Sequence, residues 1–205
     1  MDNLTNFWDN CEPVFSHIEI SDYLKDIKSL TDSWEKHFIN HYEFKDKTVI
    51  DYGIGGGYLG LYLIKNKNIK KYIGFDISKR QINAAKNNLT GLPVELYTVS
   101  NTTNFGKHNA DMFICQAVIQ HFPNEEYLID FLDNLNQSNI NEVMLQIRYN
   151  EKTIFSGSYE TTEDVRLACQ TNSEYILTYL TNYELVKSKK ITNKSNYEFL
   201  FLNKI

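Results

Sequence analysis

Hydrophobic side chains in the first part of the sequence recur with the spacing of a helix. Apolar residues three or four positions apart form one stripe between about Ser21 and Asn40, which predicts an amphipathic helix over that range. The stripe consists of Leu24, Ile27, Leu30 or Thr31, Trp34 and Phe38. We expect this apolar face, with Trp34, to pack against the rest of the protein.

After residue 46 the pattern changes to short apolar runs that alternate with helical segments. The runs predicted as buried strands are Lys47–Tyr52, Lys71–Asp76, Pro93–Val99, Ala110–Gln116 and Asn141–Arg148. The segments predicted as helices are Gly57–Asn66, a helix opened by Ser78 with Gln81 as its capping-box partner, Glu125–Leu135 and about Thr162 to Thr181. Two further predicted strands, joined by a polar turn, are Tyr183–Lys190 and Tyr197–Asn203.

This alternation of strands and helices indicates parallel βαβ units. The last two strands are too close in sequence for a crossover helix between them, so one of them must run antiparallel. We therefore expect an α/β fold with a Rossmann-like, doubly wound, seven-stranded sheet, mostly parallel with an antiparallel terminal strand. The expected division is residues 1–46 as an N-terminal helical lid segment and residues 47–205 as one α/β domain.

Length and composition fit a single domain of this kind. The chain has 205 residues, of which 42% are hydrophobic and 23% charged, as is ordinary for a folded domain. A net charge of −5 argues against a dedicated nucleic-acid binder, because phosphate contacts need clustered basic residues. Three widely spaced cysteines, a start unlike a signal peptide and the lack of a long apolar run favour a reduced, cytoplasmic protein.

The strongest chemical signal lies between the first strand and the first helix after residue 46. The turn reads Asp51-Tyr-Gly53-Ile-Gly55-Gly-Gly57-Tyr-Leu-Gly60. Glycines let a ligand approach the backbone, and the N–H groups that begin the helix favour an anionic group. Ligands of doubly wound sheets bind at the carboxyl ends of the strands, so this turn predicts a nucleotide-type site.

Two nucleotide ligands compete for this turn. The spacing Gly55-x-Gly57-x-x-Gly60, with Asp76 about 20 residues further on, satisfies the dinucleotide fingerprint and suggests NAD. Against NAD, Asp51 precedes the first glycine by two residues, where its carboxylate would repel a pyrophosphate and attract an ammonium group. The domain also fills nearly the whole chain, which leaves no second domain for a dehydrogenase substrate.

Three segments together resemble the class I S-adenosylmethionine-dependent methyltransferases of the small-molecule type. The turn from Asp51 to Gly57 is similar to motif I of that superfamily, and Gly74–Ser78 is similar to its second motif. The segment Phe113–Pro123 resembles the stretch in which the fourth strand of small-molecule methyltransferases runs into a His-containing loop. The resemblance covers residues 47–205 and implies an S-adenosylmethionine-binding methyltransferase domain.

The resemblance implies a role for each matching residue. The backbone of Gly53, Gly55 and Gly57 would pass beneath the methionine part of S-adenosylmethionine. Asp51 would lie near its ammonium group, and Asp76 would accept hydrogen bonds from both ribose hydroxyls. The other cofactor contacts that it implies are Ile77 on the adenine face, Ser100 and Asn101 beside the adenine, and Gln116 beside the sulfonium.

Methyl transfer from a sulfonium is an in-line displacement, so the enzyme mainly has to align the acceptor and exclude water. His121 is the candidate catalytic base for an acceptor that must lose a proton, since histidine titrates near about pH 6.5. The expected substrate-binding residues are Trp8, Arg148 and Tyr149. His37 and His41 lie four residues apart, but without a Cys or carboxylate pattern beside them no metal is expected.

The acceptor is expected to be a small molecule, methylated on an O or N atom. The segment Cys115–Val118 lacks the motif by which amino-methyltransferases of nucleic acids clamp a flipped base, and the acidic metal ligands of catechol-type enzymes are also absent. No nucleic-acid or membrane partner is expected, and the oligomeric state stays open. The alternatives are a non-catalytic methyltransferase-fold partner subunit and an NAD-type Rossmann binder.

The uneven charge adds one further hypothesis about the acceptor. Residues 1–46 contain ten Asp or Glu and four Lys, a net charge of −6, so residues 47–205 sum to +1. A solvated helix face explains these carboxylates. A cationic or amine acceptor, attracted by residues such as Asp22, Asp26 and Asp32, is the specific alternative.

Overall fold

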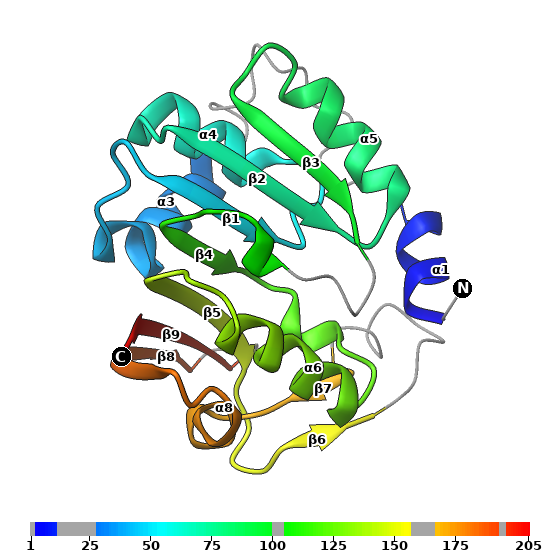
Figure 1. Ribbon diagram of the computed structural model, residues 1–205. Helices are drawn as coiled ribbons and strands as arrows, with labels where there is room; N and C mark the ends of the chain where they lie inside the picture. The colour runs from blue at the N-terminus through cyan, green and yellow to red at the C-terminus, as the bar shows by residue number, and fades with distance from the viewer. Residues whose placement is uncertain (1–2, 12–27, 100–104, 157–166, 193–195) are drawn as a thin grey trace.

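A seven-stranded sheet runs through the centre of the computed structural model, which describes residues 3–11, 28–99, 105–156, 167–192 and 196–205. Its strands are β1 (Thr48–Tyr52), β2 (Lys71–Asp76), β3 (Val94–Thr98), β4 (Met112–Cys115), β5 (Glu142–Arg148), β8 (Tyr183–Ile191) and β9 (Tyr197–Lys204). They follow the order β3-β2-β1-β4-β5-β9-β8 (Figure 1). Strands β1 to β5 pair in parallel, whereas β9 is antiparallel to both β5 and β8. The predicted fold class is confirmed.

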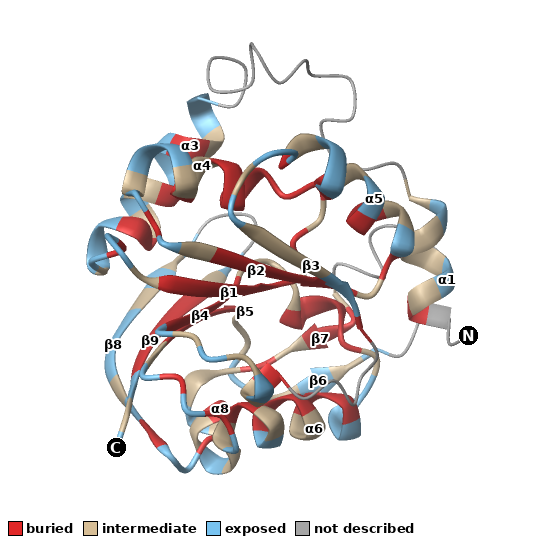
Figure 2. Ribbon diagram, turned by 45° about the horizontal axis from the view of Figure 1, so that its top comes forward, coloured by how far each residue is buried: buried red, intermediate tan, exposed pale blue. Residues whose placement is uncertain are grey.

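Helices cover both faces of this sheet (Figure 2). One face carries α3 (Lys28–His37), α4 (Tyr58–Lys67) and α5 (Lys79–Asn88), and the other carries α6 (Glu125–Asn136) and α8 (Ser173–Tyr179). Two hydrophobic clusters fill the spaces between sheet and helices. Val49 of β1 belongs to the cluster under α3 and α4, whereas Ile50 and Tyr52 belong to the cluster under α6, as the two-residue period of a strand requires.

Short elements complete the described part of the chain. They are α1 (Asn3–Asn10), the 3-10 turns η1 (Ile39–His41), η2 (Phe105–Lys107) and η3 (Ile119–His121), and the two-stranded sheet of β6 (Ile154–Phe155) and β7 (Cys169–Gln170). Figure 1 shows α1 beside the start of α5, near the edge where β1, β2 and β4 end. No helix in the described ranges has the length and apolar character needed to cross a bilayer.

Side-chain caps fix where the helices begin. Ser78 Oγ accepts a hydrogen bond from the backbone N–H of Gln81 at 3.2 Å, so the predicted start of α5 is confirmed. Asn124 Oδ1 does the same for α6 by accepting from the Tyr127 N–H at 2.9 Å. Each cap satisfies a backbone donor that the first helical turn leaves without a partner.

The predicted helix from about Thr162 to Thr181 is wrong over Cys169–Gln170. These residues form β7, which pairs antiparallel with β6, and Thr171 then bridges to the residue after β5. The helix α8 begins only at Ser173. Pairing with strands distant in sequence overrides the local periodicity here. The predicted stretch 162–166 lies outside the described residues.

The predicted helix from Ser21 to Asn40 is confirmed over α3 but ends earlier than expected. Helical structure stops at His37 and the 3-10 turn η1 follows, while residues 21–27 lie outside the described part. The break turns Phe38 and Ile39 into the core, where each is 1% exposed. Trp34 is buried and packs edge-on against Tyr62 of α4, so the inward direction of the apolar stripe is confirmed.

Candidate active site

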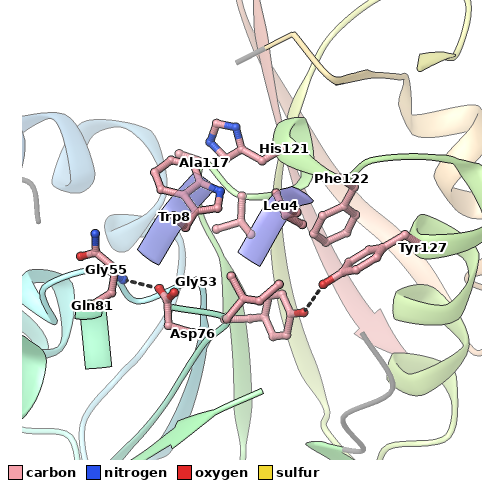
Figure 3. A pocket seen from close by; sticks show the side chains of 13 residues that line it. Leu4, Trp8, Gly53, Gly55, Asp76, Gln81, Ala117, His121, Phe122 and Tyr127 are labelled. Carbon is pink, nitrogen blue, oxygen red and sulfur yellow. Dashed lines mark hydrogen bonds between the residues drawn. The ribbon is translucent and has the colours of Figure 1, made fainter. Parts of the chain in front are cut away.

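A cavity lies at the carboxyl edge of the sheet, where β1, β2 and β4 end (Figure 3). Its volume is about 130 Å³, far above the roughly 10–15 Å³ that one buried water needs, so it accommodates an organic group. The predicted site residues that line it are Trp8, Gly53, Gly55, Asp76, Ile77 and His121. The fold thus brings together residues from α1, from the turns after β1 and β2, and from the loop after β4.

The turn after β1 is fixed to the end of β2. Gly53 has a φ of +82°, which other residues rarely adopt, and a Cβ added there would lie 2.2 Å from a methyl group of Val118. The backbone N–H groups of Gly53 and Ile54 both donate to the carbonyl of Phe75, at 2.7 and 3.1 Å. This clamp holds the glycine-rich turn next to Asp76.

Asp76 ends β2 with its carboxylate at the cavity (Figure 3). Its Oδ2 accepts from the Gly55 N–H and its Oδ1 from the Ser78 N–H, both at 2.9 Å. Burial raises the pKa of this carboxyl to about 6; the two N–H groups oppose that rise, and Asp9 on α1 adds to it. Each carboxylate oxygen has a further lone pair, so Asp76 can also accept from two ligand hydroxyls.

Asp51 is buried below the turn and is not among the residues that line the cavity. Its Oδ2 accepts a hydrogen bond from the hydroxyl of Tyr72 on β2 at 2.6 Å. Burial raises the pKa of Asp51 to about 7, the Tyr72 hydroxyl lowers it, and Asp76 raises it. A Cβ at Gly60 would lie 2.5 Å from the Tyr72 ring, so the last glycine of the sequence motif makes room for this tyrosine.

The helix α1 closes one side of the cavity. The Trp8 ring meets the His121 ring edge-on, with 4.9 Å between their centroids. The Trp8 carbonyl accepts from Ser78 Oγ at 3.2 Å, which ties α1 to the start of α5. His121 lies in η3, is 9% exposed, and has its Nε2 3.3 Å from Gln120 Nε2. The arrangement places an imidazole and an indole on the wall opposite Asp76.

Other predicted site residues are not brought to the cavity. Arg148 lies over the Tyr197 ring, 5.4 Å from its centroid, and Lys190 Nζ lies 3.8 Å from the Tyr149 ring centroid, so both predicted residues face β8 and β9. Gln116 directly precedes the cavity loop but is not among the lining residues. Gly57 caps α4 behind the turn, and Ser100 and Asn101 lie outside the described residues.

Seven residues line the cavity although the sequence assigned them no role in the site: Leu4, Tyr52, Gln81, Ala117, Val118, Phe122 and Tyr127. The hydroxyls of Tyr52 and Tyr127 lie 3.4 Å apart at one end of the cavity (Figure 3). The alternation of β1 places Tyr52 on the α6 face, a signal that the sequence contains. Gln81 was predicted only as a partner in the helix cap.

The described residues contain no group of three His, Cys, Asp or Glu side chains that could hold a metal ion. His37 and His41 do not share a helix face, because α3 ends at His37 and η1 carries His41. The His37 ring stacks on Phe199, and the His41 ring meets Phe201 edge-on. Both histidines therefore pack against β9.

The sheet order, the glycine turn and the acid that ends β2 define a Rossmann-like nucleotide-binding protein. Residues 43–198 match a protein family described as a methyltransferase domain. The chain therefore belongs to this methyltransferase family.

Solved structures share the fold along nearly the whole chain. A S-adenosylmethionine-dependent methyltransferase from Leishmania major has a TM-score of 0.69 at 14% identity, over 98% of this chain and 81% of that one. Magnesium protoporphyrin IX methyltransferase from Synechocystis, with bound S-adenosylmethionine, has 0.67 at 16%, over 100% and 98%. The N-methyltransferase NodS from Bradyrhizobium japonicum, in complex with S-adenosylhomocysteine, has 0.67 at 10%, over 99% of both chains.

A curated relative matches a shorter stretch. Peramine synthetase from Metarhizium majus is 28% identical over an alignment of 99 residues, and the match covers 42% of this chain and 4% of the synthetase. The chain thus spans a small part of that protein.

Proposed function

We propose that the protein transfers the methyl group of S-adenosylmethionine to an O or N atom of a small-molecule acceptor by in-line displacement. The observation that carries the proposal is Asp76, whose carboxylate borders the cavity while Gly55 and Ser78 hold it by their N–H groups. That arrangement places a carboxylate that can bind hydroxyl groups beside a glycine-rich turn.

The free thiols of the three cysteines support a reducing compartment such as the cytoplasm.

The donor set fits S-adenosylmethionine. Asp76 would bind the ribose hydroxyls, Ile77 would pack on the adenine, and the turn containing Gly53 and Gly55 would pass beneath the methionine part. Asp51 would act from below the turn as the counter-charge of the ammonium group. When bound, S-adenosylmethionine supplies a methyl group that its sulfonium has already activated.

The chain's own contribution is to orient the acceptor and exclude water. Trp8 and His121 form one wall of the cavity in edge-on contact. The indole of Trp8 supplies an apolar surface, and the two rings together would position a small acceptor and displace solvent. His121 would accept a proton from an acceptor hydroxyl or ammonium group. Arg148 and Tyr149, which face β8 and β9, would contact only an acceptor that extends beyond the cavity.

Calorimetry of the pure protein with S-adenosylmethionine, S-adenosylhomocysteine and NADH tests the proposal. We expect the first two to bind in the micromolar range and NADH not to bind. A labelled methyl-transfer assay on a metabolite extract, read by mass spectrometry, then identifies the acceptor. Binding of NADH alone would refute the proposal. Binding without turnover, together with a stoichiometric co-purifying protein, would favour a non-catalytic partner subunit.

The Asp76→Ala variant tests the assigned ribose contact. We expect its affinity for S-adenosylhomocysteine to fall by about 1–3 kcal/mol, because charge-assisted hydrogen bonds to the ribose are lost. The Asp111→Ala variant is the control, since Asp111 binds the Thr48 N–H at the opposite edge of the sheet. An affinity unchanged in Asp76→Ala would remove the ribose role.

A further inference from the structure

Gln120 and His121 are consecutive residues of η3 whose side chains are in contact. The turn is closed by the His121 N–H, which donates to the Val118 carbonyl at 2.8 Å, and by the Phe122 N–H, which donates to the Ile119 carbonyl at 3.0 Å. In this turn Gln120 Nε2 lies 3.3 Å from His121 Nε2. Gln120 is 6% exposed and is not among the residues that line the cavity, whereas His121 is (Figure 3). Gln120 therefore acts on the cavity only through His121.

The chemistry of the two nitrogens decides which of them donates. The electron pair of a carboxamide nitrogen is delocalised into its carbonyl group, so Gln120 Nε2 can only donate a hydrogen bond. His121 Nε2 must then be the acceptor, and its lone pair carries no proton. A neutral imidazole that accepts at Nε2 has its proton on Nδ1. The contact thus defines one tautomer of His121.

The same contact disfavours the charged form of the ring. An imidazolium carries a proton on both nitrogens, so its Nε2 could not accept from Gln120, and two donors would face each other. A hydrogen bond to the neutral form of a group works against its charged form. A neutral ring on the cavity wall does not repel the cationic sulfonium of S-adenosylmethionine, and it is also the form that can take up a proton.

We propose that Gln120 is a positioning residue for His121, which it holds as the neutral imidazole with the proton on Nδ1 and the lone pair on Nε2. The inference rests on the proposed function, in which His121 takes a proton from the acceptor, and it names Nε2 as the receiving atom. The proton of the acceptor's O–H or N–H bond would move to Nε2, the bonding electron pair would stay on the acceptor atom, and the imidazolium would later release the proton to water. At 3.3 Å the Gln120 contact is longer than the usual N–H hydrogen bond of about 2.9–3.0 Å, so an acceptor can replace it.

Other titratable groups on the elements around η3 are engaged elsewhere or uncharged. The turn packs against β5 and β7, and its imidazole touches α1. The titratable groups of these three elements are Asp9, Glu142, Arg148 and Cys169. Glu142 and Arg148 lie at the two ends of β5, the first in an ion pair and the second over an aromatic ring. Burial raises the pKa of the Cys169 thiol to about 12, and Asp9 acts on the carboxyl at the end of β2. Gln120 is therefore the neighbour whose effect on Nε2 a substitution can isolate.

Nitrogen-15 NMR of the imidazoles tests the proposal, because the chemical shifts of the two ring nitrogens distinguish the tautomers. The His121→Asn variant assigns the signals of His121 among the five histidines of the chain. In wild type we expect the tautomer with the proton on Nδ1. In Gln120→Glu, whose carboxylate accepts instead of donating, we expect the proton on Nε2 and a titration midpoint at higher pH. In Gln120→Met, which removes the donor at similar volume, we expect the midpoint of His121 to rise by about 0.4–1 pH unit, the range for one neutral hydrogen bond.

Gln146→Met is the matched control. Gln146 is a glutamine of β5 that is 5% exposed and does not line the cavity, so its replacement should leave the tautomer and the midpoint of His121 unchanged. The pH profile of methyl transfer, measured on the acceptor that the labelled assay identifies, is a second readout. Its acid limb should move to higher pH in Gln120→Met by as much as the NMR midpoint, whereas a merely structural role would not move it. If Gln120→Met folds poorly, Gln120→Leu repeats the measurements.

The outcomes separate the two proposals. If wild-type protein binds neither S-adenosylmethionine nor S-adenosylhomocysteine, the proposed function fails whichever tautomer His121 has. If wild type binds them but His121 carries its proton on Nε2, or if the midpoint is the same in wild type and Gln120→Met, only the role of Gln120 fails. An equally large shift in Gln146→Met would also overturn that role, since it would indicate a general change in packing.

Discussion

The Tyr72 hydroxyl donates a hydrogen bond to the Asp51 carboxyl, with 2.6 Å between the two oxygens. Tyr72 is fully buried and Asp51 nearly so, and each lies on the sheet face covered by α4. Among the described residues, the groups that shift the ionisation of Asp51 are the Tyr72 hydroxyl from β2 and the carboxyl of Asp76. Of these, Tyr72 is the group that stabilises the ionised form of Asp51.

The Tyr72→Phe variant should therefore raise the pKa of Asp51 above its wild-type value of about 7. Removing the hydroxyl leaves the carboxylate without its donor, so we expect a loss of about 1–3 kcal/mol of unfolding free energy at pH 8 and a smaller loss at pH 5. Carbon-13 NMR of the aspartate carboxyls measures the pKa, and urea unfolding measures the stability.

The control for this change is Tyr183→Phe, another buried tyrosine, whose hydroxyl donates to the Ile140 carbonyl at 2.9 Å. It should lower stability equally at both pH values. An Asp51 pKa that is the same in wild type and Tyr72→Phe would show that the hydroxyl does not govern its ionisation.

Motif spacing predicts some single residues and not others. Gly53 and Asp76 lie next to each other in space because parallel strands end at one edge, and a sequence shows where each strand ends. The contact between Tyr72 and Asp51 depends on which face each side chain takes and on the space left by Gly60. Gln81 was missed for a similar reason, since its place in the cap is visible in the sequence and its side-chain burial is not.

At the scale of elements, Ser78 joins two helices. Its Oγ accepts from the Gln81 N–H in the cap of α5 and donates to the Trp8 carbonyl of α1, each at 3.2 Å. Arg80 adds a second link, from its Nη1 to the Asn10 carbonyl at 3.5 Å. The position of α1 over the cavity therefore depends on the start of α5.

The Ser78→Ala variant should lose about 1 kcal/mol of unfolding free energy through the missing cap. It should also loosen α1, so that Trp8 becomes more accessible to a fluorescence quencher in a Trp34→Phe background. Asn172→Ala, which removes the cap of α8, should cost similar stability without changing Trp8. Equal quenching in Ser78→Ala and its parent would contradict the link to α1.

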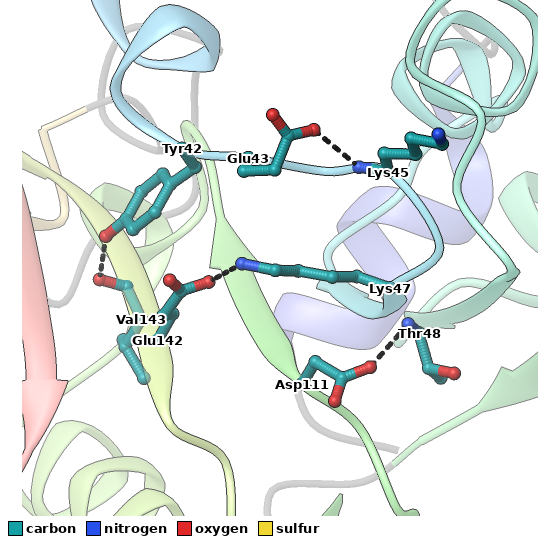
Figure 4. Close-up of polar contacts among 8 residues, drawn as sticks. All are labelled: Tyr42, Glu43, Lys45, Lys47, Thr48, Asp111, Glu142 and Val143. Atoms are coloured by element: carbon teal, nitrogen blue, oxygen red, sulfur yellow. Dashed lines mark hydrogen bonds and ion pairs between the residues drawn. The ribbon is translucent and has the colours of Figure 1, made fainter.

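The segment just before β1 is joined to the middle of the sheet (Figure 4). The Tyr42 hydroxyl donates to the Val143 carbonyl at 2.8 Å, and Lys47 forms an ion pair with Glu142. The predicted boundary after residue 46 lies inside this network. Residues on both sides of that predicted boundary, Tyr42 and Lys47, are thus bonded to β5.

The local sequence pattern predicts a strand or helix well where that element does not depend on pairing or packing with a distant segment. The bounds of β2, Lys71–Asp76, agree with the prediction because a short run of aromatic and aliphatic residues between polar residues fits one buried strand. β7 was missed because its two residues are extended only through pairing with β6. Likewise, helical spacing continues past His37, yet burial of Phe38 and Ile39 ends α3 there.

At the scale of the whole molecule, the two buried acids make stability depend on pH. The pKa of Asp51 is about 7 and that of Asp76 about 6, both above the ordinary 3.8. At a pH above the ordinary 3.8 and below the folded pKa of each carboxyl, the folded protein holds a proton that the unfolded chain has released. Their contribution to stability is therefore complete below about pH 4 and is lost as the pH rises through 6 and 7.

We expect the difference in unfolding free energy between wild type and Asp51→Asn to change with pH. Wild type should become less stable relative to the variant as the pH rises from 5 to 8, by up to about 1.4 kcal/mol for each unit of pKa shift. Urea unfolding at several pH values measures this. A difference that is constant over the range would mean that the folded pKa of Asp51 is close to that of the unfolded chain.

The two described helices of the acidic N-terminal segment, α1 and α3, lie at different places on the molecule. Asp32 lies on α3, where it pairs with Lys28 at 2.6 Å, and α3 packs on the α4 face of the sheet. Asp22 and Asp26 lie outside the described residues. In the described part of this segment, α1 is what reaches the cavity, with Trp8 and with Asp9 near Asp76. The amine-acceptor hypothesis therefore has no support from Asp32.

The position of β9 between β5 and β8 has a consequence for the order in which the sheet folds. β9 follows β8 in the chain, yet β8 joins the sheet only through β9, which itself pairs with seven residues of β5. β8 therefore cannot join the sheet until β9 has paired with β5. Until that pairing forms, the folding chain carries two unpaired strand edges, those of β5 and β8, which can associate with other chains.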